Sequence, residues 1–452
     1  MGETMCEERP LTFEDLVAWF AEGEKPKAAF KVGAEHEKFV FARQDHTRIP
    51  YDGPSGIKAL LTGLMRFGWE GVYEGEHLIA LTRGGANISL EPGGQFELSG
   101  APLATMHEIC EETGGHLHEC KIVADELGLM FLAAGFDPVT PRAEVPVMPK
   151  GRYDIMRRYM PKVGTLGLDM MLRTCTVQAN LDFADEADMA QKFRVSLALQ
   201  PIATALFANS PFKEGKPSGF LSTRANVWTD TDGDRTGMLH FVFEPGFGFE
   251  TYARYALGVP MYFVKRGGKY VDVAGRSFRD FMEGKLPELP GEKPTLKDWA
   301  DHTSTIFPEV RLKQYLEMRG ADSGPWSRIC ALPALWAGIF YDDAALAAAW
   351  DLCKGWAVDD HERLRRDVTR LGLKAEVGGR SARDVAVDMV AIARQGLKAR
   401  GNLSGGMVDE TGYLADLEEI ADSGVTPAER LLDLYNGPWQ GRIEPVFEAL
   451  AY

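Results

Sequence analysis

Short alternations of apolar and polar residues fill much of the first half of the chain, and they predict strands. Gly/Pro turns separate these segments, such as EPGG at 91–94 and EPGFG at 244–248. Helical spacing marks TFEDLVAWFAE at 12–22, EADMAQKFRVSLALQPIATALFA from about residue 186 and HEICEETGGHLHECKIVADEL at 107–127, where Gly114-Gly115 is a candidate break. From about Tyr341 amphipathic helices take over. The pattern predicts an α+β protein in which a helical C-terminal part, about 341–452, packs on an antiparallel sheet.

The chain has 452 residues, of which 45% are hydrophobic and 26% charged. Length alone suggests two or three domains. However, no internal repeat, low-complexity tract or Ser/Gly linker divides the sequence. We therefore predict a single domain over 1–452.

The formal net charge of −16 argues against nucleic acid and anionic lipid as partners. No apolar run reaches the roughly 18 residues that a membrane helix needs, the longest candidate being ALPALWAGIFY from residue 331. The acidic start does not resemble a secretory or transit peptide. Six cysteines without a C-x-x-C pair indicate mostly reduced thiols. Together these features predict a cytoplasmic protein that binds neither nucleic acid nor membrane.

Carboxylates recur on one face of several predicted strands. Alternation places Glu35 and Glu37 on the same side of GAEHEKFVF, while His36 and Lys38 point away. A second carboxylate pair, Glu91 and Glu97, flanks a tight PGG turn. In TCTVQANLDF one face is entirely polar: Thr174, Thr176, Gln178, Asn180 and Asp182. In RLKQYLEMRGAD, Glu317 and Arg319 share a face.

Any one of these segments alone is more simply read as the solvated face of an edge strand. Together they present oxygen ligands, without Cys/His pairs, as hard cations such as Mg²⁺ or Mn²⁺ require. A different cluster, His107, Cys110, His116, His118 and Cys120, has no zinc-finger spacing and is assigned to a helix. No phosphate-binding G-x-x-x-x-G-K-[ST] loop is present.

At these residues the sequence resembles the plant-type glutamate-cysteine ligases, a group that includes proteobacterial enzymes. The matching strings include GAEHEKF, SLEPGGQFELSGAPL, MLRTCTVQANLDF and KQYLEMRGADSGPW. The family is similar in catalytic fold to glutamine synthetases, whose E-x-E strand, Glu pair and E-x-R strand line a funnel of antiparallel strands. The pairs that match are Glu35/Glu37, Glu91/Glu97 and Glu317/Arg319, and Gln178 stands where those enzymes have a metal-binding histidine.

The resemblance implies an ATP-dependent ligase that makes γ-glutamylcysteine, the first step of glutathione synthesis. ATP would phosphorylate the γ-carboxylate of L-glutamate, and the amine of L-cysteine would displace phosphate. One Mg²⁺ or Mn²⁺ would bind Glu37, Glu91 and Glu97, and a second would bind Glu35, Gln178 and Glu317. The implied catalytic and substrate-binding residues are Glu317, Arg319 near the transferred phosphoryl group, Arg152 and Arg224 on substrate carboxylates, and Trp228 and Tyr262 as walls for the cysteine side chain.

The resemblance also implies a regulatory disulfide between Cys110 and Cys330. A second disulfide of the plant enzymes is expected to be absent, because Val273 and Glu288 occupy its positions. Two alternatives stay open: a ligase of the same fold that uses another amine, and a silent binding protein that kept the fold for redox regulation. A monomer and a homodimer are both compatible with the sequence.

Overall fold

A mixed sheet-and-helix architecture surrounds one large antiparallel sheet in the computed structural model, which describes residues 9–452. Cys6 and the rest of the acidic start lie outside the described residues. Within residues 9–452 the main sheet has nine strands, in the order β14-β15-β7-β1-β5-β4-β3-β2, with β6 paired to β1. Their bounds are β1 (Val32–Ala42), β2 (Glu70–Glu74), β3 (His77–Arg83), β4 (Ala86–Leu90), β5 (Phe96–Ser99), β6 (Leu129–Leu132), β7 (Thr176–Leu181), β14 (Val310–Leu312) and β15 (Leu316–Asp322). All pairings in it are antiparallel, which confirms the predicted α+β class.

The register of the central strand β1 brings the acidic positions together. Glu37 lies opposite Glu97 on β5, and Glu35 lies opposite Gln178 on β7. Directly opposite residues of an antiparallel pair have Cβ atoms about 5 Å apart, so these side chains emerge as neighbours on one face. The sheet thus places carboxylates from distant parts of the chain side by side.

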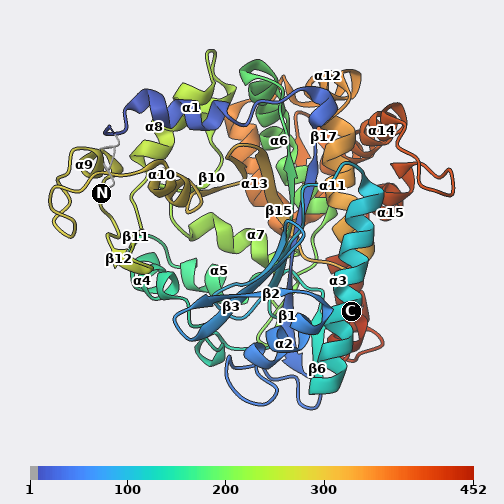
Figure 1. Cartoon of the computed structure of the whole chain (residues 1–452). Coiled ribbons are helices and arrows are strands. Elements are labelled where there is room, and N and C mark those ends of the chain that lie inside the picture. Colours follow the sequence, from blue (N-terminus) through green and yellow to red (C-terminus); the bar gives the residue numbers. More distant parts are fainter. Residues whose placement is uncertain (1–8) are drawn as a thin grey trace.

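Long helices cover the sheet (Figure 1). α3 (Met106–Leu127) begins with a capping box between Thr105 and Glu108 and continues unbroken through Gly114-Gly115, so the candidate break there is wrong. α6 (Glu186–Leu206) and α11 (Trp326–Phe340) are almost wholly buried, and both pack on the sheet. Packing of its one buried face against α11, α2 and β6 outweighs the cost of two glycines in the middle of α3.

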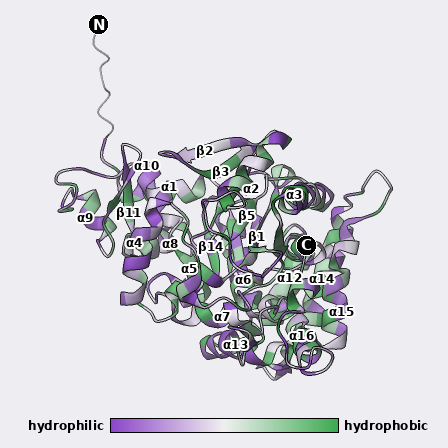
Figure 2. Ribbon diagram, turned by 90° about the horizontal axis from the view of Figure 1, so that it is seen from below, coloured by the Kyte–Doolittle hydropathy of each residue, from purple (hydrophilic) through white to green (hydrophobic). Residues whose placement is uncertain are grey.

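Helices follow Tyr341 to the end of the chain: α12 (Asp343–Cys353), α13 (Val358–Leu371), α14 (Ala382–Arg400), α15 (Ala415–Ser423), α16 (Pro427–Asn436) and α17 (Val446–Ala449). The first four of them pack on α6 or α11 and share their hydrophobic core, whereas α16 and α17 pack in a separate cluster against β1 and β6. Figure 2 shows hydrophilic and hydrophobic residues mixed along these outer helices, as expected where one face packs on the core and the other is solvated. This arrangement confirms the predicted helical C-terminal part.

Smaller elements complete the fold around the sheet. They are α1 (Phe13–Ala21), α2 (Ile57–Leu64), α4 (Gly151–Tyr159), α5 (Gly167–Arg173), α7 (Thr223–Val227), α8 (Phe249–Gly258), α9 (Phe278–Met282), α10 (Leu296–Thr303) and the hairpin β11 (Phe263–Arg266) with β12 (Lys269–Asp272). Across residues 9–452 no single helix has the length and apolar character to cross a membrane; α11 and α12 meet the criterion only jointly, and they are bent by 96° at their junction.

Candidate active site

A cavity of about 540 Å³ opens over the acidic face of the sheet. Strands β1, β4, β5 and β7 supply one wall, the β14–β15 hairpin a second, and α4 and α7 a third. The predicted site residues that line it are Glu35, Glu37, Glu91, Glu97, Arg152, Gln178, Arg224, Trp228 and Arg319. The fold therefore gathers residues that are up to 284 positions apart around one space.

Strand alternation separates this face from the core as expected. Glu35 and Glu37 face the cavity, whereas His36 and Lys38 are fully buried behind β1. There the Lys38 Nζ lies 3.1 Å from His116 Nε2. On β7 the polar side chains predicted to share a face, from Thr174 to Asp182, all line the cavity.

Glu37 and Glu97 form the centre of the acidic group. The Thr176 N–H donates to Glu37 Oε2 at 3.0 Å, and the Ser89 hydroxyl donates to Glu97 Oε2 at 2.7 Å. Burial, followed by the nearby Glu91 and Glu97 carboxylates, raises the pKa of Glu37 well above its usual value. Burial and Glu91 likewise raise the pKa of Glu97. Without a cation these carboxylates repel one another.

Glu35 is held at the edge of this group by Asn180, whose Nδ2 donates to Glu35 Oε1 at 2.8 Å. Burial and the charges of Glu317 and Glu97 raise the pKa of Glu35 to about 7. Glu35 is thus poised to change its charge near neutral pH, or to bind a cation that keeps it ionised.

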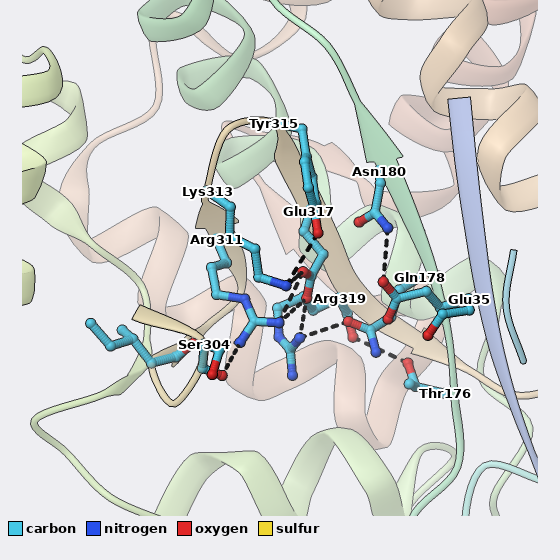
Figure 3. A network of polar contacts seen from close by, with 12 residues as sticks. Glu35, Thr176, Gln178, Asn180, Ser304, Arg311, Lys313, Tyr315, Glu317 and Arg319 are labelled. Atoms are coloured by element: carbon cyan, nitrogen blue, oxygen red, sulfur yellow. Dashed lines mark hydrogen bonds and ion pairs between the residues drawn. The ribbon is translucent and has the colours of Figure 1, made fainter. Parts of the chain in front are cut away.

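Glu317 has a different environment, since three basic side chains surround it (Figure 3). Arg311 Nη2 and Lys313 Nζ lie 2.7 and 3.0 Å from its carboxylate oxygens, and Arg319 Nη1 also pairs with it. Burial alone would raise the pKa of Glu317, but these cations hold it well below its usual value. Glu317 is fully buried and does not line the cavity.

Arg319 reaches from Glu317 to Gln178. Its Nη1 donates to Gln178 Oε1 at 2.6 Å, so the guanidinium lies between two of the three predicted ligands of the second metal site. Sequence reasoning did not identify Arg311 and Lys313. Both have odd numbers like Glu317 and Arg319, and counting back in steps of two along VRLKQYLEMR would have found them.

Arg152 and Arg224 supply positive charge on the other walls. Arg152 on α4 stacks on the ring of Tyr153, with 5.1 Å from guanidinium carbon to ring centroid, and its buried Nε has no hydrogen-bond partner among the described residues. Arg224 on α7 donates to the Arg319 carbonyl oxygen at 2.7 Å. Arginines with free donor capacity facing a cavity are suited to grip carboxylate or phosphate.

Of the two aromatic residues expected near the cysteine side chain, only Trp228 lines the cavity. Tyr262 is buried elsewhere: its ring centroid lies 3.8 Å from the guanidinium carbon of Arg235, and its hydroxyl lies 3.5 Å from Met160 Sδ. The position of Tyr262 therefore does not suit the expected role, because its ring packs against Arg235 rather than facing the cavity.

Cys110 and Cys330 are both buried free thiols. They come together where α3 crosses α11, and contact with Cys110, together with burial, raises the pKa of the Cys330 thiol.

The remaining members of the His/Cys cluster of α3 do not form a metal site. In residues 9–452 no three His, Cys, Asp or Glu side chains converge closely enough to hold a metal ion as they stand.

The donor set at the acidic wall still has the chemistry of a hard-cation site. Glu37, Glu91 and Glu97 offer only oxygen atoms and line the same cavity, and the charge of Glu91 raises the pKa of both Glu37 and Glu97. A divalent cation would relieve this repulsion and draw the carboxylates inward. The residues present therefore fit Mg²⁺ or Mn²⁺ better at this wall than at Glu317, whose charge is already balanced by three basic groups.

The chain is similar over nearly its whole length to curated plant enzymes. It is 56% identical over 451 residues to the chloroplastic glutamate–cysteine ligase of Arabidopsis thaliana, covering 100% of this chain and 85% of that protein. It is 57% identical to the chloroplastic enzyme of Nicotiana tabacum, covering 98% and 83%. The expected cytoplasmic location is contradicted by these relatives, which are named as chloroplastic. Net charge and the composition of the first residues do not determine the compartment.

A solved structure shares the fold: glutamate–cysteine ligase of Francisella tularensis in complex with AMP, with a TM-score of 0.53 over 90% of this chain and 85% of that one, at 11% identity. Residues 31–449 match Glutamate-cysteine ligase family 2 (GCS2). Since a match of this extent accompanies more than 55% identity to named ligases, the chain belongs to the family 2 glutamate-cysteine ligases, enzymes of the first step of glutathione synthesis.

Proposed function

We propose that the cavity over the acidic strands joins glutamate to cysteine in two steps. ATP transfers its γ-phosphoryl group to the side-chain carboxylate of glutamate, which releases ADP and gives γ-glutamyl phosphate. The amine of cysteine then attacks the acyl carbon, an amide bond forms, and phosphate and a proton leave. The observation that supports this proposal best is the meeting, in one cavity, of an oxygen-rich cation wall and four arginines, Arg152, Arg224, Arg311 and Arg319.

The positions of Arg319, Arg152 and Arg224 favour a different role for each wall of the cavity. Arg319 lies beside the acidic strands and has the place to stabilise charge on the transferred phosphoryl group. Arg152 and Arg224 stand on the helical walls, where their planar guanidinium groups suit the carboxylates of the two amino-acid substrates. Trp228, next to them, offers an apolar surface for the cysteine side chain.

We infer that Mg²⁺, or Mn²⁺, binds with ATP at Glu37, Glu91 and Glu97. When bound, it neutralises the triphosphate that this acidic wall would otherwise repel. A second ion at Glu35, Gln178 and Glu317 requires Arg319 to leave Gln178 and Glu317, because its guanidinium now bonds both.

Product analysis tests the reaction. Purified protein with Mg²⁺, ATP, L-glutamate and L-cysteine should release one phosphate per γ-glutamylcysteine formed. An α-linked product, or AMP in place of ADP, would contradict the two-step route. ADP release with glutamate and a panel of amines separates cysteine from other acceptors.

We also propose that oxidation links Cys110 and Cys330, since two buried thiols in contact need little movement to form a disulfide. The bridge would join α3 to α11, next to the sheet strands that carry the site.

The subunit number, a monomer or a homodimer, stays a prediction that sedimentation velocity can test.

A further inference from the structure

A second cavity, of about 250 Å³, lies among α11, α15, α16 and α17. It shares no lining residue with the active-site cavity. Its lining combines the polar residues Asn209, Arg328, Asp416, Glu419 and Arg430 with six apolar ones. The apolar residues include Ile420, Pro427, Leu431, Leu434, Ala449 and Leu450. A space of this size holds several waters or one small organic molecule.

Arg328 has no charge partner of its own. Its side chain folds back over Gly324, with Nε 3.0 Å from the point that a Cβ there would occupy. The nearest charged groups are engaged elsewhere: Asp416 accepts from the Ser327 hydroxyl at 2.5 Å, and Arg430 pairs with Glu419 at 2.8 Å. No salt bridge or side-chain hydrogen bond to another described residue holds the Arg328 guanidinium.

Arg328 is half-buried and lines this cavity without a carboxylate at salt-bridge distance among the described residues. Burial lowers the pKa of Arg328 to about 10, and the charge of Asp416 partly offsets this. A guanidinium group in this position has free donors for a carboxylate or phosphate. Arg328 also lies in the first turn of α11, where the helix dipole favours a negative charge.

The rest of the lining restricts which anion fits. Asp416 and Glu419 on the rim disfavour a dianion such as phosphate or a dicarboxylate. The apolar wall, with Leu431 buried and Leu434 36% exposed, favours a ligand with an aliphatic body. The geometry points to a binding site for a small aliphatic monocarboxylate, with its carboxylate on Arg328 and its body against Leu431 and Leu434.

Calorimetric titration of the full chain at constant ionic strength tests this site, with 4-methylpentanoate as the probe and 4-methylpentanamide as its uncharged match. We expect saturable binding of the acid with a stoichiometry of one. The amide should bind at least about tenfold more weakly, because it cannot form the charge-assisted pair. Arg328→Gln should weaken the binding of 4-methylpentanoate by about tenfold or more. Arg366→Gln, which changes an exposed arginine outside the cavity, should leave it unchanged.

Two further variants locate the binding. Arg152→Gln alters the active site and should leave 4-methylpentanoate binding intact; loss of binding in this variant would place the acid in the active site instead. Leu434→Gln should weaken 4-methylpentanoate more than acetate, because only the former reaches the apolar wall. If Arg328→Gln does not fold, the binding of the two acids to Leu434→Gln still tests the proposed site.

Equal binding by the wild type and Arg328→Gln, or equal affinity for acid and amide, would overturn the proposal. So would a different outcome in sedimentation velocity: a dimer that Arg328→Gln abolishes, without any acid binding, would assign Arg328 to a contact between chains.

Discussion

Glu37 and Glu97 keep two carboxylates in buried positions directly opposite each other on β1 and β5. Each accepts a hydrogen bond from the sheet, which orients it toward the cavity. Burial and the charge of the nearby Glu91 raise the pKa of both groups. Residues arranged this way reduce stability in the absence of a cation, which is typical of binding sites and unusual for structural positions.

Replacing Glu97 with alanine should lower kcat by about a hundredfold or more, because a metal ligand is lost. The same change should raise the melting temperature in EDTA, since a buried repulsive charge is removed. Steady-state kinetics and thermal unfolding measure the two effects. Glu70→Gln, at an exposed position on β2, is the control and should change neither. Near-normal kcat in Glu97→Ala at ordinary Mg²⁺ would remove Glu97 from the metal site.

The pKa of Glu35 makes the stability of the metal-free protein depend on pH. The pKa is about 7 in the folded state and about 4.3 in an unfolded chain. The folded state therefore binds the proton more tightly, and the stability from this group is complete below about pH 4.3 and lost as the pH rises through about 7. The shift corresponds to at most about 4 kcal/mol.

Urea unfolding in EDTA measures this effect. Glu35→Gln should gain stability relative to the wild type between pH 5 and pH 8, by up to about 4 kcal/mol. The gain should shrink with saturating Mg²⁺, which keeps Glu35 ionised. A difference between variant and wild type that does not change with pH in EDTA would contradict the assignment.

Among the secondary-structure elements, strand β15 is irregular next to the active-site cavity. The pairing of β15 with β7 shifts between Met318 and Ala321, so Arg319 and Gly320 lie in a bulge. The helix α6 supports the bulge from behind: the Thr204 hydroxyl donates to the Gly320 carbonyl oxygen at 2.9 Å. The bulge directs Arg319 into the cavity, beside Gln178.

Gly320→Ala should disturb this element. A Cβ at this position would lie 2.4 Å from Gln200 Nε2 and 2.8 Å from Thr204 Oγ1. Overpacking should reduce the free energy of unfolding by about 1–3 kcal/mol. A shift of Arg319 should lower kcat by up to about a hundredfold. Stopped-assay kinetics and urea unfolding measure these changes.

The companion variants make the test specific. Adding Gln200→Ala to Gly320→Ala should restore part of both losses, because neither polar atom of the Gln200 amide has a partner in the described structure. Gly233→Ala should be neutral, as its Cβ would meet nothing within 4 Å. Unchanged kcat in Gly320→Ala would show that the bulge does not position Arg319.

At the scale of the whole molecule, α3 and α11 connect the first and last thirds of the chain. Their contact contains the Cys110–Cys330 pair. A disulfide there would close a loop of about 220 residues and stabilise the fold by at most about 5.4 kcal/mol in the chain-entropy account.

We expect mildly oxidised protein to yield a Cys110–Cys330 cross-linked peptide by mass spectrometry. It should also show a higher urea midpoint than the reduced form, and its activity should fall with dithiothreitol. Cys110→Ser should remove all three effects, whereas Cys353→Ser, at a buried thiol away from this contact, should retain them. Equal activity of the wild type with and without reductant would remove the regulatory role.

The α+β class, the helical C-terminal part and the faces of the acidic strands could all be predicted from local sequence patterns. Alternation with a period of two depends only on local backbone geometry, so it assigned Glu35 and Glu37 to one side and Lys38 to the other. Matching strings indicated the family for the same reason, since they require no knowledge of distant contacts.

Which of these residues come into contact, and in what charge environment, depends on tertiary contacts between distant segments and was visible only in the structure. The β14–β15 hairpin brings Arg311 and Lys313 onto Glu317, and this pairing changes Glu317 from a free ligand into a neutralised one. Tyr262 packs on Arg235 instead of facing the cavity. The helix α3 continues through its two glycines because neighbouring elements pack on its buried face. Such outcomes depend on strand register and helix packing between segments far apart in the chain, and local spacing contains no information about either.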